Sequence, residues 1–354
     1  MLSVRLEDVT KRFGDVIAAD HVSLHVNPGE FFTLLGPSGC GKTTVLRTIA
    51  GFYRSGGSGP NRLDEGRVYF GEQDVTSLEP YERNSSMVFQ DYALWPHMNV
   101  FDNVAYGLKI RKIGRDETEK RVSNTLRLVG LEGLGKRIPS ELSGGQRQRV
   151  ALARALVVEP DVFLLDEPLS NLDAKERVRV RGEIRRIQIE LKITSIYVTH
   201  DQEEALCISD RIAVLYQGKL QQIGAPMEIY KKPEKAFVAD FLGFEGPVLD
   251  GEIKGRKVYL KDIDQHLTFE KVKERYPSRV KAIIKPNDVE IREDRNGNFL
   301  VKDTIFLGPT ISYEVQVHDG KIIKVLEKYV KTKKHIEKGK RVRLKIHEPI
   351  RVFG

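Results

Sequence analysis

Gly36-Pro37-Ser38-Gly39-Cys40-Gly41-Lys42-Thr43 fits the pattern G-x-x-x-x-G-K-[ST] at every fixed position. The stretch follows an apolar run at residues 30–35, expected as a strand, and opens an expected helix at residues 42–50, which is the context that the pattern requires. Its glycines let backbone N–H groups close around a β-phosphate, and the start of the helix adds a favourable partial charge. A glycine-rich turn with a chance lysine would not explain the full match. The stretch therefore predicts a nucleotide-binding α/β fold.

The polar groups of this phosphate loop have distinct expected tasks. Lys42 is expected to reach the β- and γ-phosphates of ATP, where it also serves catalysis, and Thr43 to place its hydroxyl on Mg²⁺. Cys40 is expected to be a spacer whose backbone faces the nucleotide, with a reactive thiol as the lesser alternative. The residues of the loop expected to bind ATP are Ser38, Gly39, Cys40, Gly41, Lys42, Thr43 and Thr44.

An acidic pair ends an apolar run farther along the chain, in Val162-Phe163-Leu164-Leu165-Asp166-Glu167. Ligands bind outside the carboxyl ends of strands in an open α/β sheet. We expect Asp166 to hold Mg²⁺ through water and Glu167 to act on the attacking water as a general base. Many strands end in acidic residues, so the pair gains its meaning from the phosphate loop that precedes it.

Three single residues extend the expected site. Gln90 follows the run Met87-Val88-Phe89, and its amide is expected to coordinate Mg²⁺ and sense the γ-phosphate. His200 ends the run 196–199 and is expected to contact the γ-phosphate and orient Glu167 or the water. Phe13 is expected to stack on adenine. Without the other motifs, each has a simpler interpretation: a surface amide, a helix cap and a core aromatic.

The order of apolar patterns defines the fold class. Apolar runs at residues 162–165 and 194–199 are typical of buried parallel strands, and they alternate with expected helices at residues 100–130, from Ser143 to about Val158, and at 174–191. Beyond Gly246 the pattern changes to short strands divided by turns, typical of a small β-barrel or sandwich. These strands are expected at residues 280–285, 299–306, 311–317, 321–326 and 341–346.

Composition supports two domains and limits the class of protein. The 354 residues are 40% hydrophobic and 31% charged, as in soluble globular proteins, and no uninterrupted apolar run approaches the length of a membrane span. Two cysteines provide no disulfide framework, which fits a reducing cytoplasm. The whole formal net charge of +8 lies beyond residue 244, which supports a boundary there. A basic domain can bind nucleic acid or anionic lipid, but the scattered basic residues favour a solvated surface.

Taken together, the chain resembles the ATPase subunits of ABC transporters over essentially its whole length. Leu142-Ser143-Gly144-Gly145-Gln146 matches the signature sequence of that family, and Ser170-Asn171-Leu172-Asp173 is similar to its D-loop. In the same comparison His200 matches the switch histidine, Gln90 the Q-loop glutamine and Phe13 the adenine-stacking aromatic. The resemblance implies a P-loop ATPase domain at residues 1–240, with a helical subdomain at about 91–160.

The resemblance also narrows the subfamily. Phe89 to Val100 and Tyr197 to Ala205 are similar to importer ATPases of the maltose and multiple-sugar class. Gln222 to Pro226 and Phe237 to Gly243 resemble the junction into a C-terminal regulatory β-barrel of the TOBE type, an OB-like domain expected at residues 241–354. Ile283 to Val289 resembles a strand of that domain, with Lys285 and Asn287 in place of the usual arginine and glutamate.

The family resemblance implies a two-chain mechanism. Two copies pair head to tail, so that Ser143 and the N–H groups of Gly144 and Gly145 cap the ATP held by the other copy. Expected partners are therefore a second copy, two integral membrane permease subunits and, indirectly, an extracellular solute-binding protein, at the cytoplasmic face of the membrane. The expected cofactors are ATP and Mg²⁺, with Thr43, Gln90 and Asp166 as the metal-binding residues.

The cargo is the least constrained part of this interpretation. The sequence of residues 92–100 and the β-domain strand at Ile283 to Val289 favour sugars as the cargo over polyamines, glycerol phosphate, sulfate and ferric iron. A soluble ABC ATPase acting on nucleic acid or ribosomes is a competing class. Such proteins usually carry a coiled coil or two ATPase cassettes, neither of which the sequence contains, so no nucleic-acid partner is expected.

Overall fold

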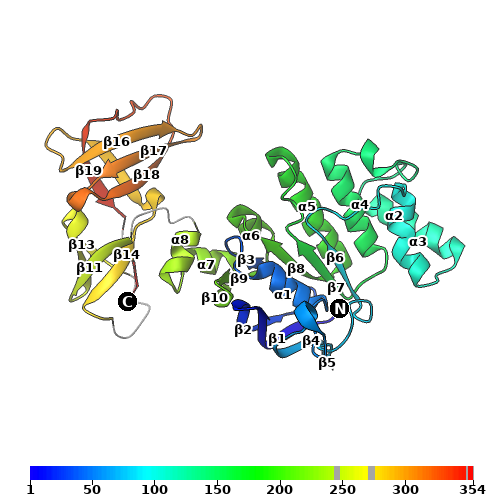
Figure 1. Ribbon diagram of the computed structural model, residues 1–354. Helices are drawn as coiled ribbons and strands as arrows, with labels where there is room; N and C mark the ends of the chain where they lie inside the picture. Colours follow the sequence, from blue (N-terminus) through cyan, green and yellow to red (C-terminus); the bar gives the residue numbers. More distant parts are fainter. Residues whose placement is uncertain (243–247, 270–275, 348–349, 354) are drawn as a thin grey trace. The chain divides into compact units, whose positions relative to one another are not determined.

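The computed structural model describes residues 1–242, 248–269, 276–347 and 350–353, and it divides into two compact units, residues 1–229 and 230–354 (Figure 1). The division falls ahead of the boundary expected between residues 240 and 241. The reason is that α8 (Ala236–Phe241) packs on β14 (Arg279–Ile283), through Ala239 and Ile283, and so belongs to the second unit. The charge boundary near residue 244 and the junction residue Gly243 lie outside the described residues.

A six-stranded mixed sheet forms the centre of the first unit, in the order β10-β9-β3-β8-β7-β6. β3 pairs in parallel with β8 and β9, and β7 pairs in parallel with β6 and β8, whereas β10 is antiparallel to β9. The bounds are β3 Phe31–Leu35, β6 Ser85–Val88, β7 Val162–Asp166, β8 Thr194–Thr199, β9 Arg211–Tyr216 and β10 Lys219–Gly224.

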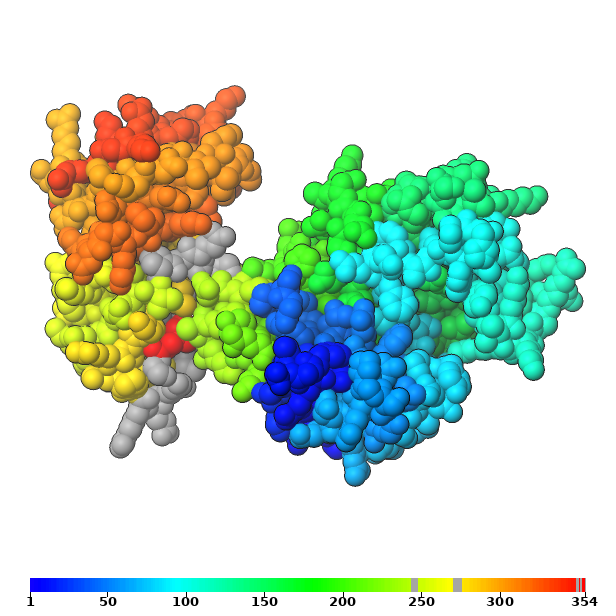
Figure 2. All heavy atoms as spheres, viewed as in Figure 1, coloured from blue at the N-terminus to red at the C-terminus, as the bar shows by residue number. Residues whose placement is uncertain are grey.

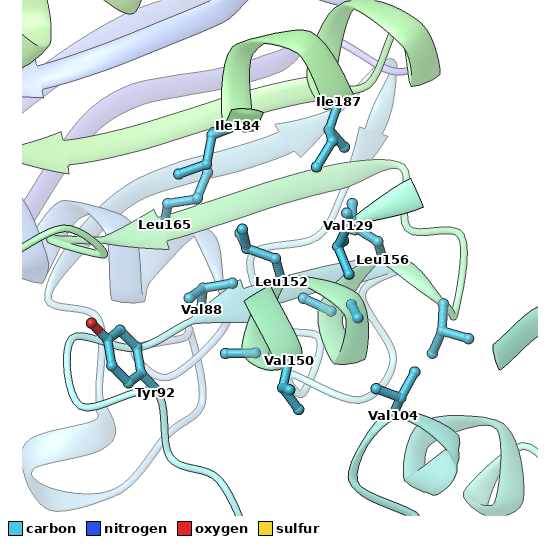
Figure 3. Close-up of a cluster of buried hydrophobic side chains, with 14 of the residues drawn as sticks. Val88, Tyr92, Val104, Val129, Val150, Leu152, Leu156, Leu165, Ile184 and Ile187 are labelled. Carbon is cyan, nitrogen blue, oxygen red and sulfur yellow. The ribbon is translucent and has the colours of Figure 1, made fainter. Parts of the chain in front are cut away.

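Alternate residues of the central strands supply two separate cores, because successive side chains of a strand point to opposite faces. Phe31 and Phe163 pack with α4 (Gly144–Leu156) and α5 (Ala174–Leu191) on one face. Phe32 and Leu164 pack with α1 (Lys42–Ile49) on the other. Figure 3 shows part of the first core, where Leu165 of β7 lies between α4 and α5. Both faces are covered, which explains why these strands are apolar without interruption.

A second, antiparallel sheet packs over the α1 face, in the order β2-β1-β4-β5. Its hydrophobic side chains join the core that contains α1, through Leu6, Leu24 and Val68. The bounds are β1 Val4–Phe13, β2 Val16–Val26, β4 Glu65–Phe70 and β5 Gln73–Asp74, with the short 3₁₀ turn η1 at Gly59–Asn61. This sheet borders the phosphate loop, because Ala18 of β2 lies against Gly41.

Helices α2, α3 and α4 form a helical group within the first unit, visible as the cyan and green part of Figure 2. Asn99 caps α2 by accepting a hydrogen bond from the backbone N–H of Asp102, and the group packs around Val104, Val122 and Val150. The bounds are α2 Val100–Ile110, α3 Arg115–Leu128 and, after the 3₁₀ turn η2 at Pro139–Glu141, α4. The remaining helices are α6 Gln202–Ile208 and α7 Pro226–Lys231.

The second unit is built from β-sheets, in the orders β13-β12-β11-β14-β20 and β15-β19-β16-β17-β18, around one shared hydrophobic core. The strands at Phe299–Phe306 and Arg341–Ile346 have the bounds expected from the sequence. The segment expected to resemble a strand at residues 283–289 differs: Pro286–Asp288 is the 3₁₀ turn η4 between β14 and β15, because proline cannot donate to a sheet ladder.

The strands of the second unit are short and are divided by turns. Besides β14, they are β11 Val248–Lys254, β12 Lys257–Leu260, β13 Gln265–Thr268, β15 Val289–Glu293, β16 Phe299–Phe306, β17 Thr310–Gln316, β18 Ile322–Lys328, β19 Arg341–Ile346 and β20 Arg351–Phe353, with 3₁₀ turns η3 Lys261–Ile263 and η5 His318–Gly320. Across the described parts of both units, the helices are too short or too polar to span a bilayer.

One buried cation ties the end of α1 to the loop before β6. Arg83 Nη1 donates to the carbonyls of Thr48 and Ile49, at 2.8 Å each, and Nε donates to the carbonyl of Leu78 at 3.2 Å. Burial lowers the pKa of Arg83 to about 10, which still leaves the guanidinium charged at neutral pH. Arg83 thus satisfies C-terminal carbonyls of the helix that carries the phosphate loop.

We expect Arg83→Met to lower the free energy of unfolding by about 3 kcal/mol, because it leaves several buried carbonyls without a donor. Urea titration followed by circular dichroism measures this loss. Arg62→Met is the matched control, since Arg62 is exposed and precedes β4 in the same part of the chain. Equal midpoints for the two variants would contradict the structural role given to Arg83.

Candidate nucleotide site

The phosphate loop between β3 and α1 packs closely against other segments of the same chain. Gly41 has φ +101° and is the N-cap of α1, and a Cβ there would lie 2.0 Å from the carbonyl oxygen of Ala18. A Cβ on Gly36 would lie 2.3 Å from the carbonyl oxygen of Leu215. Both positions therefore require glycine, which lets the loop pack directly against the backbone of Ala18 and Leu215.

Lys42 and Thr43 begin α1 and point in different directions. Lys42 is buried, and its Nζ donates to the carbonyls of Gly36 and Pro37 at 2.8 and 2.9 Å, so the ammonium lies back over the loop. Thr43 Oγ1 donates to Asp166 Oδ1 at 2.8 Å, which joins α1 to the end of β7. The pair expected to hold Mg²⁺ is thus assembled, with two oxygens at hydrogen-bonding distance.

Asp166 is a carboxyl held in a largely dry position. Burial raises its pKa above the usual value, and the hydrogen bond from Thr43 and the charge of Arg47 oppose that rise. A buried carboxylate that lacks a full counter-charge is costly. The site is therefore suited to a divalent cation, which would offset the charge, and its oxygen donors are the kind that Mg²⁺ prefers.

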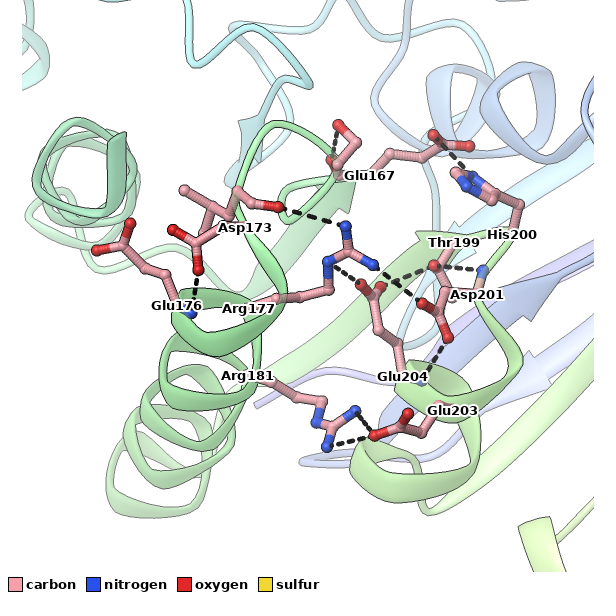
Figure 4. A network of polar contacts seen from close by, with 12 residues as sticks. Glu167, Asp173, Glu176, Arg177, Arg181, Thr199, His200, Asp201, Glu203 and Glu204 are labelled. Atoms are coloured by element: carbon pink, nitrogen blue, oxygen red, sulfur yellow. Dashed lines mark hydrogen bonds and ion pairs between the residues drawn. The ribbon is translucent and has the colours of Figure 1, made fainter. Parts of the chain in front are cut away.

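Glu167 and His200 are brought together from the ends of β7 and β8, as expected. His200 Nδ1 lies 3.1 Å from Glu167 Oε2 (Figure 4). Glu167 has φ +42°, an unusual value outside glycine, and its backbone N–H donates to the carbonyl of Val198 at 3.1 Å. The backbone thereby turns the carboxylate of Glu167 out of the strand and toward the phosphate loop.

A cleft of about 400 Å³ brings residues of the phosphate loop together with Gln90 and Glu167. Asp166 and His200 are not part of its lining, but they contact Thr43 and Glu167, which are. Its lining includes the loop, Gln90 and Glu167, and also Ala18, which the sequence analysis did not single out. Gln90 is placed by the D-loop, because Asn171 Nδ2 donates to its carbonyl at 2.8 Å. The lining consists of Ala18, Ser38, Gly39, Gly41, Lys42, Thr43, Thr44, Gln90 and Glu167. A nucleotide with Mg²⁺ fits this set of glycines, cation, hydroxyls and carboxylate, together with Asp166, which accepts from Thr43.

The signature residues do not line this cleft. Ser143 caps α4 reciprocally with Gln146: the Gln146 N–H donates to Ser143 Oγ at 3.3 Å, and the Ser143 N–H donates to Gln146 Oε1 at 2.9 Å. A Cβ on Gly145 would lie 2.2 Å from Glu176 Oε1, and one on Gly144 would lie 3.3 Å from Leu172. The two glycines therefore let the start of α4 approach the start of α5.

Phe13, Cys40 and Asp173 also lie apart from the lining of the cleft. Phe13 is 38% exposed, contacts Tyr53 edge to face and has Lys11 Nζ 4.5 Å above its ring. Cys40 is buried, and burial raises the pKa of its thiol, which agrees with a spacer more than with a nucleophile. Asp173 caps α5 by accepting from the Glu176 N–H at 2.9 Å. Stacking of Phe13 on adenine stays a prediction.

A buried polar network behind His200 was not anticipated from the sequence. Glu204 accepts from Tyr197 Oη at 2.8 Å. It also accepts from Thr199 Oγ1 at 2.8 Å, and Arg177 Nε lies 3.8 Å from its other oxygen (Figure 4). Burial raises the pKa of Glu204. Asp201 caps α6, and its spacing to Glu204 is the D-x-x-E sign of a helix start, which could have indicated the turn but not the network. The network fixes the turn that carries His200.

A larger cavity, of about 490 Å³, lies elsewhere in the first unit, between α3, the end of α4 and the end of α5. Its lining mixes apolar residues such as Leu128 and Leu156 with Arg121 and Glu190. Its lining contains no residue of the phosphate loop, so the smaller cleft is the candidate nucleotide site.

Comparisons with known proteins identify the family of the chain. Residues 19–170 match the model of the ABC transporter family. The chain is 42% identical to the Fe(3+) ions import ATP-binding protein FbpC of Fusobacterium nucleatum, over 99% of this chain and 93% of the relative. It is 44% identical to the spermidine/putrescine import ATP-binding protein PotA of Clostridioides difficile, over 90% and 88%.

Solved structures give the same result for the first unit. The chain resembles cbiO1 from Clostridium perfringens, part of the ABC transporter complex cbiONQ, with a TM-score of 0.58 and 29% identity over 65% of this chain and 90% of that one. It also resembles the ATP-binding cassette MJ0796 in a dimeric post-hydrolysis state with ADP and Pi, with a TM-score of 0.54 and 31% identity over 63% and 98%.

The chain therefore belongs to the ATP-binding proteins of ABC transporters. Within that class it is an ABC importer ATPase: it hydrolyses ATP with Mg²⁺ and acts as a dimer with membrane permease subunits. The expected fold class, a P-loop ATPase followed by an OB/TOBE-like β-domain, is confirmed.

Asp166→Asn separates metal binding from stability. Because burial raises the pKa of Asp166, its charged form opposes folding at every pH above that raised value, and the effect disappears as the pH falls below the ordinary carboxyl range. We expect the variant without nucleotide to be more stable at pH 7.5 by about 1–2 kcal/mol. The gain should shrink toward pH 4 in urea titrations.

Asp166→Asn should also lose the extra thermal stabilisation that Mg²⁺ adds to ATP binding, as measured by differential scanning calorimetry. Asp161→Asn is the control, since Asp161 lies before the same strand and accepts from Asn84 at 2.9 Å, away from the cleft. A variant that still responds to Mg²⁺ as the parent does would remove Asp166 from the metal site.

Proposed function

We propose that the chain energises uptake of ferric iron through an ABC importer, at the cytoplasmic face of the membrane. Each ATP is held between the phosphate loop of one copy and the signature residues of the other. One observation supports the shared site above the rest: Ser143, Gly144 and Gly145 open a helix suited to an anion, but they do not line the cleft of their own chain.

Within the cleft we assign Glu167 the role of general base toward the attacking water, with His200 orienting it from 3.1 Å. Lys42, whose Nζ bonds to the loop carbonyls in this structure, would neutralise phosphate charge. Thr43, Asp166 and Gln90 would hold Mg²⁺, which screens the charge of the phosphates when bound. Phe13, Ser38, Gly39, Cys40, Gly41, Thr44, Gln146 and Asp173 complete the proposed nucleotide-binding set.

The cargo proposal replaces the preference for sugars. Relatives aligned along nearly the whole chain are named for Fe(3+) import, at 42% identity in Fusobacterium nucleatum and 46% in Rhizobium meliloti. Polyamines are the second candidate, from the relative named for spermidine and putrescine. The sequence of residues 92–100 is a poor guide to the cargo, because no residue of the ATPase subunit contacts the solute in the arrangement proposed here. A pattern in those residues records ancestry rather than cargo chemistry.

Glu167→Gln should bind ATP normally but hydrolyse it about 100-fold or more slowly, since the general base is lost with little change in shape. In this background ATP should drive the chain into a dimer, seen by light scattering coupled to size exclusion. Rapid turnover by Glu167→Gln would exclude the role given to Glu167.

Adding Ser143→Arg to Glu167→Gln should abolish the ATP-dependent dimer, because the new side chain would occupy the γ-phosphate position of the partner's site. ATP affinity of the single chain, held by Lys42 and the loop, should persist. Ser140→Arg is the matched control, on an exposed serine of the preceding 3₁₀ turn. A dimer that survives Ser143→Arg would argue against the shared site.

The cargo is tested in cells that depend on this chain for its importer. Deletion of the chain should abolish uptake of radioactive ferric iron and leave spermidine and maltose uptake unchanged, and the Glu167→Gln chain should fail to restore it. Loss of spermidine uptake instead would select the second candidate. Loss of maltose uptake alone would reinstate sugars.

A further inference from the structure

The segment between Gln90 and α2 contains two adjacent residues in the left-handed conformation. Tyr92 has φ +64° and Ala93 has φ +46°, values that residues with a Cβ rarely adopt and that two neighbours adopt together more rarely still. Neither is glycine or asparagine, so the local sequence does not favour this backbone. Something outside the segment must hold it, and such positions often mark functional sites.

Arg154, in the last turn of α4, makes that contact. Its Nη2 donates to the carbonyl of Tyr92 at 2.7 Å, and its Nη1 donates to the carbonyl of Ala93. The guanidinium also lies over the ring of Trp95, 4.8 Å from its centroid, and the Trp95 ring contacts the ring of Tyr106 of α2 in a tilted arrangement, with 4.2 Å between centroids. One planar cation therefore holds both strained carbonyls and the aromatic residue that follows them.

Both ends of the same segment are fixed by other elements. At the start, Asn171 of the D-loop donates to the carbonyl of Gln90. At the far end, the buried Asn103 of α2 accepts from the Trp95 N–H at 2.9 Å and donates to the carbonyls of Trp95 and Met98 at 3.1 and 3.0 Å. The middle of the segment, at residues 92 and 93, is thus the part whose conformation depends on Arg154.

The Tyr92 ring anchors the segment against the same helix. Tyr92 is 5% exposed and belongs to the core that contains Val150 and Leu152 of α4 (Figure 3). A shift of α4 must therefore carry Tyr92 with it, through the ring as well as through the carbonyls. The N-terminus of α4 carries Ser143, so Arg154 and Ser143 lie at opposite ends of one rigid helix.

We propose that Arg154 is a positioning residue that holds Tyr92–Ala93 in the left-handed conformation and thereby couples Gln90 to the signature end of α4. This inference rests on the roles proposed above for Gln90 and Ser143. When Gln90 follows a γ-phosphate in its own cleft, the displacement reaches α4 through two hydrogen bonds and the Tyr92 ring. ATP in one cleft thus helps to place the serine that caps the partner's ATP.

Replacement of Arg154 tests the coupling. We expect Arg154→Gln to lower kcat for ATP hydrolysis by about tenfold or more, because the signature end is misplaced. KM for ATP should stay within about twofold of the parent, because the phosphate loop is untouched. Arg154→Lys keeps the charge but lacks the planar guanidinium that reaches both carbonyls, so its kcat should lie between those of Arg154→Gln and the parent. If Arg154→Gln does not fold, the kcat of Arg154→Lys decides the outcome.

Rescue by glycine tests the strain itself. Glycine adopts the left-handed conformation without a clamp, so adding Ala93→Gly to Arg154→Gln should recover kcat by about threefold or more. Arg111→Gln is the matched control, because Arg111 also bonds a carbonyl across helices, that of Val158 at 2.9 Å, but at a residue outside this segment. Its kcat should equal that of the parent.

Trp95 gives a direct optical readout, since it is the single tryptophan of the chain. In the Glu167→Gln background, ATP with Mg²⁺ should change its emission, and Arg154→Gln should remove that change while ATP still binds. If Arg154 served stability alone, the variants at Arg154 would have shifted urea midpoints, but ATP would still change the emission of Trp95.

The inference is overturned if Arg154→Gln keeps the kcat of Arg111→Gln, if Ala93→Gly gives no recovery, or if the Trp95 response to ATP persists. Its failure can be told from failure of the proposed function. If Glu167→Gln stalls hydrolysis while Arg154→Gln turns over normally, only the coupling is wrong. If Glu167→Gln turns over rapidly, the proposed roles in the cleft are wrong.

Discussion

Parallel pairing of β3, β8 and β7 is the constraint on which the rest of the first unit depends. Parallel strands end at the same edge of a sheet, so the loop after β3, the acidic pair at the end of β7 and the histidine after β8 meet there. The contacts Thr43–Asp166 and Glu167–His200 follow from this geometry, although the residues are more than a hundred and more than thirty positions apart. Without the pairing, the motifs would be scattered polar residues.

The same edge concentrates electrostatic cost. Asp166 and Glu204 are buried carboxyls with raised pKa values, and Lys42 is a buried cation that bonds to carbonyls instead of a carboxylate. Asp166 and Lys42 suit a ligand that brings several negative charges and a divalent cation, whereas Glu204 is held by Tyr197 and Thr199. The hydrophobic cores on the two faces of the sheet supply stability that offsets the burial of these charged groups.

The helical group converts this edge into half of a larger site. α4 presents Ser143 at its start and holds the segment after Gln90 near its end, through Arg154 and the core around Tyr92. A straight helix of 13 residues transmits displacement with little loss, because its backbone hydrogen bonds resist bending. Nucleotide sensing and the surface offered to a second copy are therefore properties of one rigid element.

The phosphate loop, the acidic pair, the signature stretch and the strands at Phe299–Phe306 and Arg341–Ile346 could be predicted from the sequence, because glycine positions and apolar periodicity are local properties. Which of these residues meet could not be predicted in that way. The fold placed Arg154 on Tyr92 and Ala93, built the network around Glu204 and assigned α8 to the second unit. These features depend on contacts between distant segments, which no local pattern encodes.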